Sequence, residues 1–187
     1  MLISLRSSPR RPEGSDDTPD VVDLLLDCHG RIRKFSQLAV RLAEAPAPLA
    51  DVADAAAQVL RYFSVALPLH VLDEDEMLTP RLVALPPPLE VAGALGTMAR
   101  QHREIDALLE DLLRYWAELA EVPGRRSSMQ EVLVEGSALL VALFDEHLRI
   151  EEETIFPAVR QLVPVEARRA MAEQARQRRA SQLGGVG

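Results

Sequence analysis

The chain has few aromatic residues and a single cysteine among its 187 residues. Aromatic residues make up 4% of the composition, whereas hydrophobic residues, rich in Leu and Ala, make up 48%. This mixture favours packed helices over β-sheet, because strands draw on aromatic and β-branched side chains. One cysteine, Cys28, excludes an internal disulfide framework and is typical of a reducing compartment. The net charge of −8 argues against nucleic acid as a partner.

The sequence also lacks the segments that direct a chain into or across a membrane. Residues 1–12 contain no apolar stretch of the kind that a signal peptide needs. The longest uninterrupted apolar run, residues 138–144, is far too short to span a bilayer. We therefore expect a soluble, cytoplasmic protein with no membrane partner, and its length fits a single domain.

Apolar residues recur at helical spacing through most of the chain and predict four long helices. Residues 1–17, rich in Ser, Pro, Arg and Asp without periodicity, are predicted to be disordered. Thr18 is the predicted cap of the first helix, with Pro19 at its first position. Pro68 should kink the second helix, and Pro157 should end the fourth. The four helices are expected at about 18–44, 49–78, 91–119 and 129–156.

Short loops between these helices predict an all-α fold, an up-down-up-down four-helix bundle over residues 18–160. Residues 161–187 should form an extra C-terminal helix and a frayed tail. The helical part of this tail, residues 166–179, is strongly basic. We expect its arginines to contact either the acidic remainder of the bundle or a protein partner.

The four histidines of the chain form two matched sets. His70 and His147 are each followed by a glutamate four residues later, a second glutamate six residues later and a proline ten residues later. His29 and His102, which lie upstream of them, each have an isoleucine three residues later. The chain therefore consists of two copies of one unit, with every histidine at an equivalent position.

Each copy places a histidine and a carboxylate on one helical face. Residues four apart share a face, so Glu74 points the same way as His70, and Glu151 the same way as His147. A helix bundle can gather such residues around a central cavity. Imidazole with carboxylate suits iron, manganese or zinc. Taken singly, each residue is better explained as an ordinary core or surface residue, but their repetition in both halves favours a binuclear metal site.

These motifs resemble the hemerythrin family in its HHE cation-binding form, over about residues 18–180. The resemblance is carried by His29 and by three stretches: L-P-L-H-x-x-x-E at 67–74, H-x-x-I at 102–105 and H-x-x-x-E-x-x-x-I-F-P at 147–157. It implies two non-haem iron ions, bridged by the carboxylates of Glu74 and Glu151 and by an oxo or hydroxo group. The terminal ligands that it implies are His29, His70, His102 and His147.

One position departs from the family pattern. Oxygen-carrying hemerythrins have a fifth histidine one turn after the histidine of the third helix, where this chain has Asp106. Either Asp106 ligates one iron as a third carboxylate, or that iron keeps a more open coordination and Asp106 is solvated. An acidic replacement should stabilise the ferric state, which weakens the case for reversible oxygen carriage.

Three functions stay open. The first, which we expect, is a di-iron protein that binds or senses oxygen, nitric oxide or peroxide, or handles iron, without turnover. The second is a di-iron enzyme with peroxidase-like or oxidase activity, although no histidine is preceded by the glutamate of a Glu-x-x-His motif. The third is a metal-free helical interaction module. A small diatomic or peroxide ligand is the expected partner in the first case.

Overall fold

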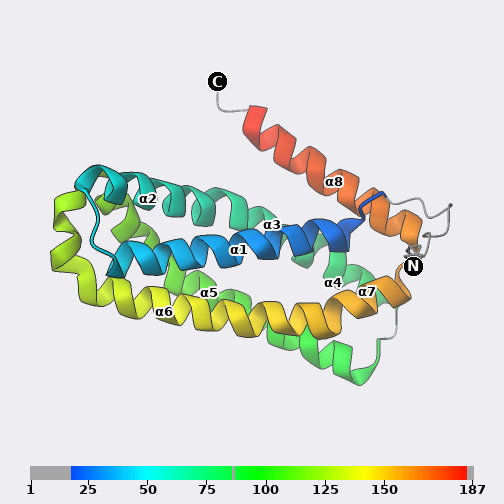
Figure 1. The fold of residues 1–187 in the computed structure, drawn as a ribbon. Helices are drawn as coiled ribbons and strands as arrows, with labels where there is room; N and C mark the ends of the chain where they lie inside the picture. Colours follow the sequence, from blue (N-terminus) through cyan, green and yellow to red (C-terminus); the bar gives the residue numbers. More distant parts are fainter. Residues whose placement is uncertain (1–17, 86, 185–187) are drawn as a thin grey trace, which may run out of the picture.

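The computed structural model describes residues 18–85 and 87–184, and the regular structure within those residues is entirely helical. Four long helices run up, down, up and down along one axis, and a shorter helix folds back against them (Figure 1). The predicted all-α bundle with an extra C-terminal helix is confirmed. The predictions for residues 1–17 and for the last three residues lie outside the described residues.

Two of the long helices are regular, and two contain π-helical turns. The first long helix is α1 (Val21–Glu44), and the third is α5 (Leu89–Glu121). The tail helix is α8 (Val165–Gly184). The second long helix consists of α2 (Leu49–Arg61), η1 (Tyr62–Ala66), α3 (Leu67–Asp73), η2 (Glu74–Leu78) and α4 (Thr79–Ala84). The fourth consists of η3 (Pro123–Arg125), α6 (Arg126–Ile150), η4 (Glu151–Ile155) and α7 (Phe156–Leu162).

Each π-helical turn, η1, η2 and η4, comes just before a proline. A proline inside an α-helix has no N–H to donate, and its ring clashes with the carbonyl four residues back. In these turns the residue before the proline donates instead to the carbonyl five residues back. The three bonds run from Leu67 to Tyr62, from Thr79 to Glu74 and from Phe156 to Glu151. The wider turn therefore lets the helix continue past each proline.

The π-helical turns correct two predicted boundaries. The fourth long helix does not end at Pro157 but continues to Leu162. The second long helix continues beyond Leu78 to Ala84, and the distortion expected at Pro68 is the π-helical turn η1 that precedes it. In both helices the missing N–H is accommodated by a local change of pitch, so the chain keeps its direction.

The start of α1 corrects a third prediction. The cap is Asp20 and not Thr18, because the Asp20 carboxylate accepts hydrogen bonds from the N–H groups of Val22 and Asp23. The Asp23 carboxylate in turn accepts from the N–H of Asp20. This reciprocal capping box satisfies the donors that the sequence had assigned to Thr18.

The core consists of two apolar clusters. One surrounds Trp116 and Phe63 towards the end of the bundle where α1 joins α2. The other surrounds Leu25 and Met98 and includes Met171 of the tail helix. Along α1, Leu25 before His29 belongs to the second cluster and Ile32 after it to the first; along α5, Met98 before His102 belongs to the second and Ile105 after it to the first. The four histidines therefore form a polar layer between two apolar cores.

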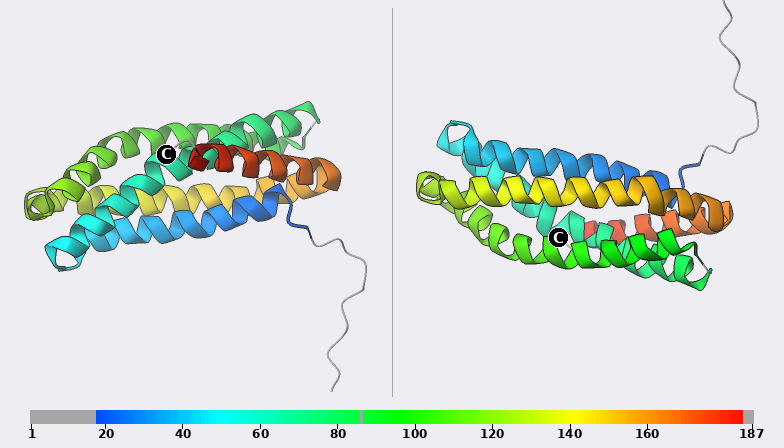
Figure 2. Two further views of the ribbon diagram at one scale, coloured as in Figure 1. Left: turned by 90° about the horizontal axis from the view of Figure 1, so that it is seen from above. Right: turned by 90° about the horizontal axis from the view of Figure 1, so that it is seen from below.

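The tail helix α8 packs across α1 and α3 on one side of the bundle (Figure 2). Three of its arginines reach acidic side chains of the bundle: Arg168 Nε lies 2.6 Å from Asp20 Oδ2, Arg178 Nη1 lies 3.3 Å from Glu76 Oε2, and Arg179 Nη1 lies 2.5 Å from Asp73 Oδ2. The basic helix thus contacts the acidic bundle, which is one of the two alternatives left by the sequence. A protein partner for this helix stays a prediction.

Two helical segments, Leu49–Ala84 and Pro123–Leu162, are long and apolar enough to cross a membrane by length and composition alone. The core helices of a packed bundle pass the same test. Each segment also supplies a histidine and a glutamate to the polar layer, as described below.

Candidate metal centre

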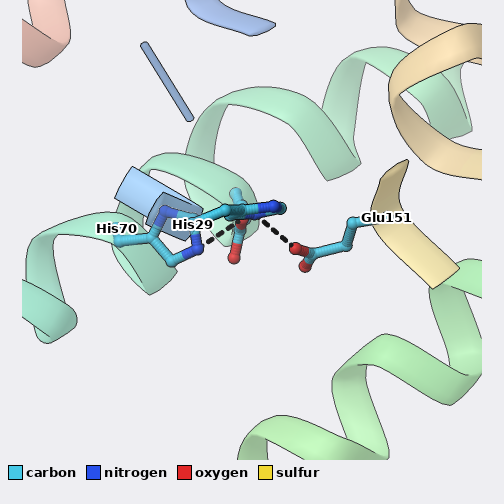
Figure 3. A group of neighbouring side chains, drawn as sticks. His29, His70 and Glu151 are labelled. Atoms are coloured by element: carbon cyan, nitrogen blue, oxygen red, sulfur yellow. Dashed lines mark ion pairs between the residues drawn. The ribbon is translucent and has the colours of Figure 1, made fainter. Parts of the chain in front are cut away.

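The polar layer gathers one histidine from each long helix. They are His29 of α1, His70 of α3, His102 of α5 and His147 of α6, and none is more than 6% exposed. Glu74 and Glu151, the first residues of η2 and η4, are fully buried beside them. Figure 3 shows the rings of His29 and His70 and the carboxylate of Glu151 pointing toward one another.

Each glutamate faces two histidines, one with each carboxylate oxygen. Glu151 Oε2 lies 3.0 Å from His29 Nε2, and Glu151 Oε1 lies 3.1 Å from His147 Nε2. In the same way, Glu74 Oε1 lies 3.0 Å from His70 Nε2, and Glu74 Oε2 lies 3.4 Å from the Nε2 of the histidine of α5. The two carboxylates therefore lie between two pairs of histidines.

Two groups of donor atoms result, and they share both glutamates. One contains His29 and His70, the other His102 and His147, and within each group the donor atoms lie within 4.8 Å of one another. An ion with ligand bonds of about 2.1 Å brings neighbouring donor atoms to roughly 3 Å from one another. The spacing of the donors therefore fits two metal ions, one in each group.

Many of these donors lack another partner among the described residues. Both carboxylate oxygens of each glutamate, and the Nε2 atoms of His29, His70 and His102, are buried without a hydrogen bond. A buried polar group without a partner costs several kcal/mol, and a buried unpaired charge costs more. A cation bound between these atoms would satisfy all of them together. Without a cation they stay buried and unpaired, which is not expected of ordinary core residues.

Burial shifts the pKa values of these groups towards their neutral forms. It raises the pKa of Glu151 to about 8, with a further contribution from the charge of Glu74, and it raises the pKa of Glu74 well above its usual range. Burial, together with neighbouring histidines, lowers the pKa of His147 to about 3 and that of His70 well below its usual range. Neutral imidazole is the form that binds a metal, and a bound cation would keep both carboxylates ionised.

Two further carboxylates, which the sequence reading missed, contact the outer nitrogens of the histidines. Glu152 Oε1 lies 2.7 Å from His29 Nδ1, and Asp75 Oδ1 lies 3.3 Å from His102 Nδ1. Partners of this kind fix the orientation of metal-ligating imidazoles. Each lies one residue after the central glutamate of its helix, and this repeated acidic position is the sequence signal that could have revealed it.

The structure places the seventh candidate residue, Asp106, outside both donor groups. Its side chain is exposed and lines, together with Asp75, a surface cavity of about 490 Å³ whose other lining residues belong to η1, α3 and α5. This position fits the solvated alternative for Asp106, and its role as an iron ligand stays a prediction. Glu76 and Glu153, the glutamates six residues after His70 and His147, have side chains that are 62% and 63% exposed and lie outside both donor groups.

The sequence matches the family model described as the hemerythrin HHE cation binding domain, over residues 20–159 and again over residues 93–181. The first match covers most of the chain. The second begins in the second half of the chain, as expected when the two halves repeat one motif. Among curated proteins, no match to this sequence was found.

Proposed function

Because the chain belongs to the hemerythrin HHE cation-binding domain family, we propose that its polar layer holds two non-haem iron ions and binds or senses a small molecule. The candidates for that molecule are oxygen, nitric oxide and peroxide, and the alternative task is the handling of iron itself. When bound, iron supplies a centre that changes oxidation state and takes a small ligand at an open coordination position.

The observation that carries the proposal is the position of the two carboxylates. Glu74 and Glu151 each present one oxygen to the His29 and His70 pair and the other oxygen to the His102 and His147 pair. A single ion would use one oxygen of each carboxylate and leave the other two oxygens buried without a partner. Two ions would use all four, so the donor set supports a binuclear centre that both glutamates would hold together.

The burial of the centre supports a small ligand over a large organic substrate. The four histidines are at most 6% exposed, and both glutamates are fully buried. The cavity of about 490 Å³ reaches Asp75 but is lined by none of these six residues. A diatomic molecule or peroxide fits such an enclosed position better than a bulky substrate.

The proposal is tested by measuring the metal content of the purified chain, together with its ultraviolet–visible spectrum before and after exposure to oxygen and to peroxide. We expect about two irons per chain, one for each donor group, and a charge-transfer spectrum that changes reversibly with the bound molecule. Continued consumption of peroxide would favour the di-iron enzyme. A chain without metal, or with one loosely held zinc, would contradict the proposal and favour the helical interaction module.

A further inference from the structure

The donor atoms define two metal positions with different surroundings. The first position is bounded by His29 and His70, and the second position by His102 and His147, with one oxygen of each glutamate in both. Each position has one histidine whose outer nitrogen faces a carboxylate from another helix. These two contacts occupy equivalent places in the two halves of the chain, so they can be compared directly.

At the first position the outer carboxylate is held firmly. Glu152 Oε1 lies 2.7 Å from Nδ1 of the fully buried His29. Arg33 Nη2 lies 2.9 Å from the same oxygen and donates a hydrogen bond to the other, Oε2, at 3.0 Å. Phe156 stacks on the imidazole ring, with 5.1 Å between the ring centroids. Charge-assisted hydrogen bonds are stronger than neutral ones, so this network fixes the ring.

At the second position the outer carboxylate is held loosely. Asp75 Oδ1 lies 3.3 Å from His102 Nδ1, and this nitrogen makes no well-formed hydrogen bond. The Asp75 side chain is 50% exposed and lines the surface cavity. Within the described parts of the chain, no arginine or lysine forms an ion pair with it. Water and ions from solution therefore compete for Asp75.

Two residues at equivalent places in the repeat explain why the outer carboxylate is held firmly at the first position and loosely at the second. Arg33 follows His29 by four residues, and Asp106 follows His102 by four residues. Where the first position has a cation that holds Glu152, the second has an anion that lines the same cavity as Asp75. Like charges facing one cavity repel, and Asp106 therefore disfavours the inward position of Asp75.

The remaining histidines, His70 at the first position and His147 at the second, also differ in their outer contacts, and this smaller difference favours the second position. Gln101 Oε1 lies 3.3 Å from His147 Nδ1, whereas His70 Nδ1 has no hydrogen-bond partner. The second position thus has a contact that the first lacks. A neutral amide at this distance contributes less than the charged network around His29, so the balance still favours the first position.

We propose that Arg33 and Asp106 are positioning residues that make the two metal positions unequal: the first holds its ion tightly, and the second exchanges its ion readily. The inference rests on the proposed two-ion centre. Changes in the outer partners of metal-ligating histidines alter metal affinity by roughly 10–100-fold. We therefore expect the release rates of the two ions to differ by at least about tenfold.

The test follows iron release from the full chain loaded anaerobically with ferrous iron and mixed with an excess of a ferrous chelator that absorbs visible light. The native sequence should release its iron in two phases of equal amplitude. Asp106→Arg supplies Asp75 with the partner that Glu152 already has, and should slow the fast phase about tenfold while leaving the slow phase unchanged. Arg33→Ala should speed the slow phase until the two phases merge.

Glu104→Arg is the matched control, because it makes the same charge change on an exposed residue of α5 two positions away. It should leave both phases unchanged, and circular dichroism should show that all variants keep their helices. Release of two ions at one common rate in every variant would overturn the inference and leave the two-ion centre standing. So would an effect of Asp106→Arg on the slow phase. Binding of fewer than two ions by the native sequence would overturn the proposed function as well.

Discussion

The two halves of the chain supply the same inner residues to the metal centre and support them differently. The residue before the central glutamate is Asp73 in the first half and Ile150 in the second. The residue before the upstream histidine is Cys28 in the first half and Gln101 in the second. The repeat is therefore kept where donor atoms must converge, and it is lost where each half meets its own neighbours.

The first half depends on the tail helix in a way that the second does not. Asp73 is fully buried, and its carboxylate lies 2.5 Å from Arg179 Nη1 and 3.6 Å from Arg178 Nε. Burial raises the pKa of Asp73, and the guanidinium of Arg179 opposes that shift. The apolar Ile150 needs no such partner. One half is thus completed by ion pairs with α8, and the other by ordinary apolar packing.

The largest effect is expected from substitution of either central glutamate, because each contacts histidines of both metal positions. Glu74→Ala and Glu151→Ala should each remove most of both ions, because each carboxylate faces both positions. Loss of a structural metal should lower the free energy of unfolding by several kcal/mol. Elemental analysis and thermal unfolding measure both effects. Glu153→Ala, which changes an exposed glutamate of the same π-helical turn, is the control and should keep both ions. Retention of one full ion by either variant would contradict the bridging role.

The second prediction tests whether the ion pair between the tail helix and Asp73 stabilises the first half. Arg179→Ala removes the closest partner of the buried Asp73, and breaking a buried ion pair is expected to cost about 3 kcal/mol. Arg160→Ala removes a pair with Asp23 in which both side chains are about half exposed, and it should cost less than about 1 kcal/mol. Urea unfolding of both variants measures the difference. Equal small effects would mean that α8 does not support the first half.

The third prediction tests whether the buried carboxyls that the two halves supply are neutral in the metal-free protein. Burial raises the pKa of Glu151 to about 8, so this carboxyl favours folding less as the pH rises from about 4.5 to about 8. Burial also raises the pKa of Glu74, which acts in the same direction above about pH 4.5. The lowered pKa values of His147 and His70 act oppositely, since stability rises with pH until about pH 6.5. The two effects oppose each other between about pH 4.5 and 6.5.

Of these four groups, only the two carboxyls still contribute to the pH dependence of stability above pH 6.5. Metal-free protein should therefore lose stability between pH 6.5 and 8, by about 2 kcal/mol for Glu151 alone. The iron-loaded protein should behave oppositely, because metal affinity rises as the ligands lose their protons. Urea unfolding at pH 6.5 and pH 8, with and without iron, measures both trends. Metal-free protein that gained stability over this range would show that the carboxyls are not neutral in the fold.

Sequence reading predicted the helices from the spacing of apolar residues, and the convergence of the histidines from the repetition of one motif in both halves. It missed the π-helical turns, since proline was expected to end a helix, and here the backbone widens instead. It also missed Glu152 and Asp75. A residue five positions after a histidine lies roughly 140° around the helix from it, so it faces away from its own histidine. The repeated acidic position marks these two residues in the sequence, but their partner is a histidine on another helix, so the packing of the bundle is needed to identify that contact.

The smallest expected effect concerns Asp106, the residue at which the two halves carry opposite charges. Asp106→Asn should leave two ions bound at saturation, because its exposed side chain lies outside both donor groups. It should slow release from the second position by less than Asp106→Arg does, since removal of a repelling charge supplies no new partner to Asp75. Metal analysis after loading with excess iron checks the first point, and chelator kinetics check the second. Loss of one ion would instead assign Asp106 as a third carboxylate ligand. The negative charge at this position would then serve to bind the metal, and it would not act by weakening the contact between Asp75 and His102.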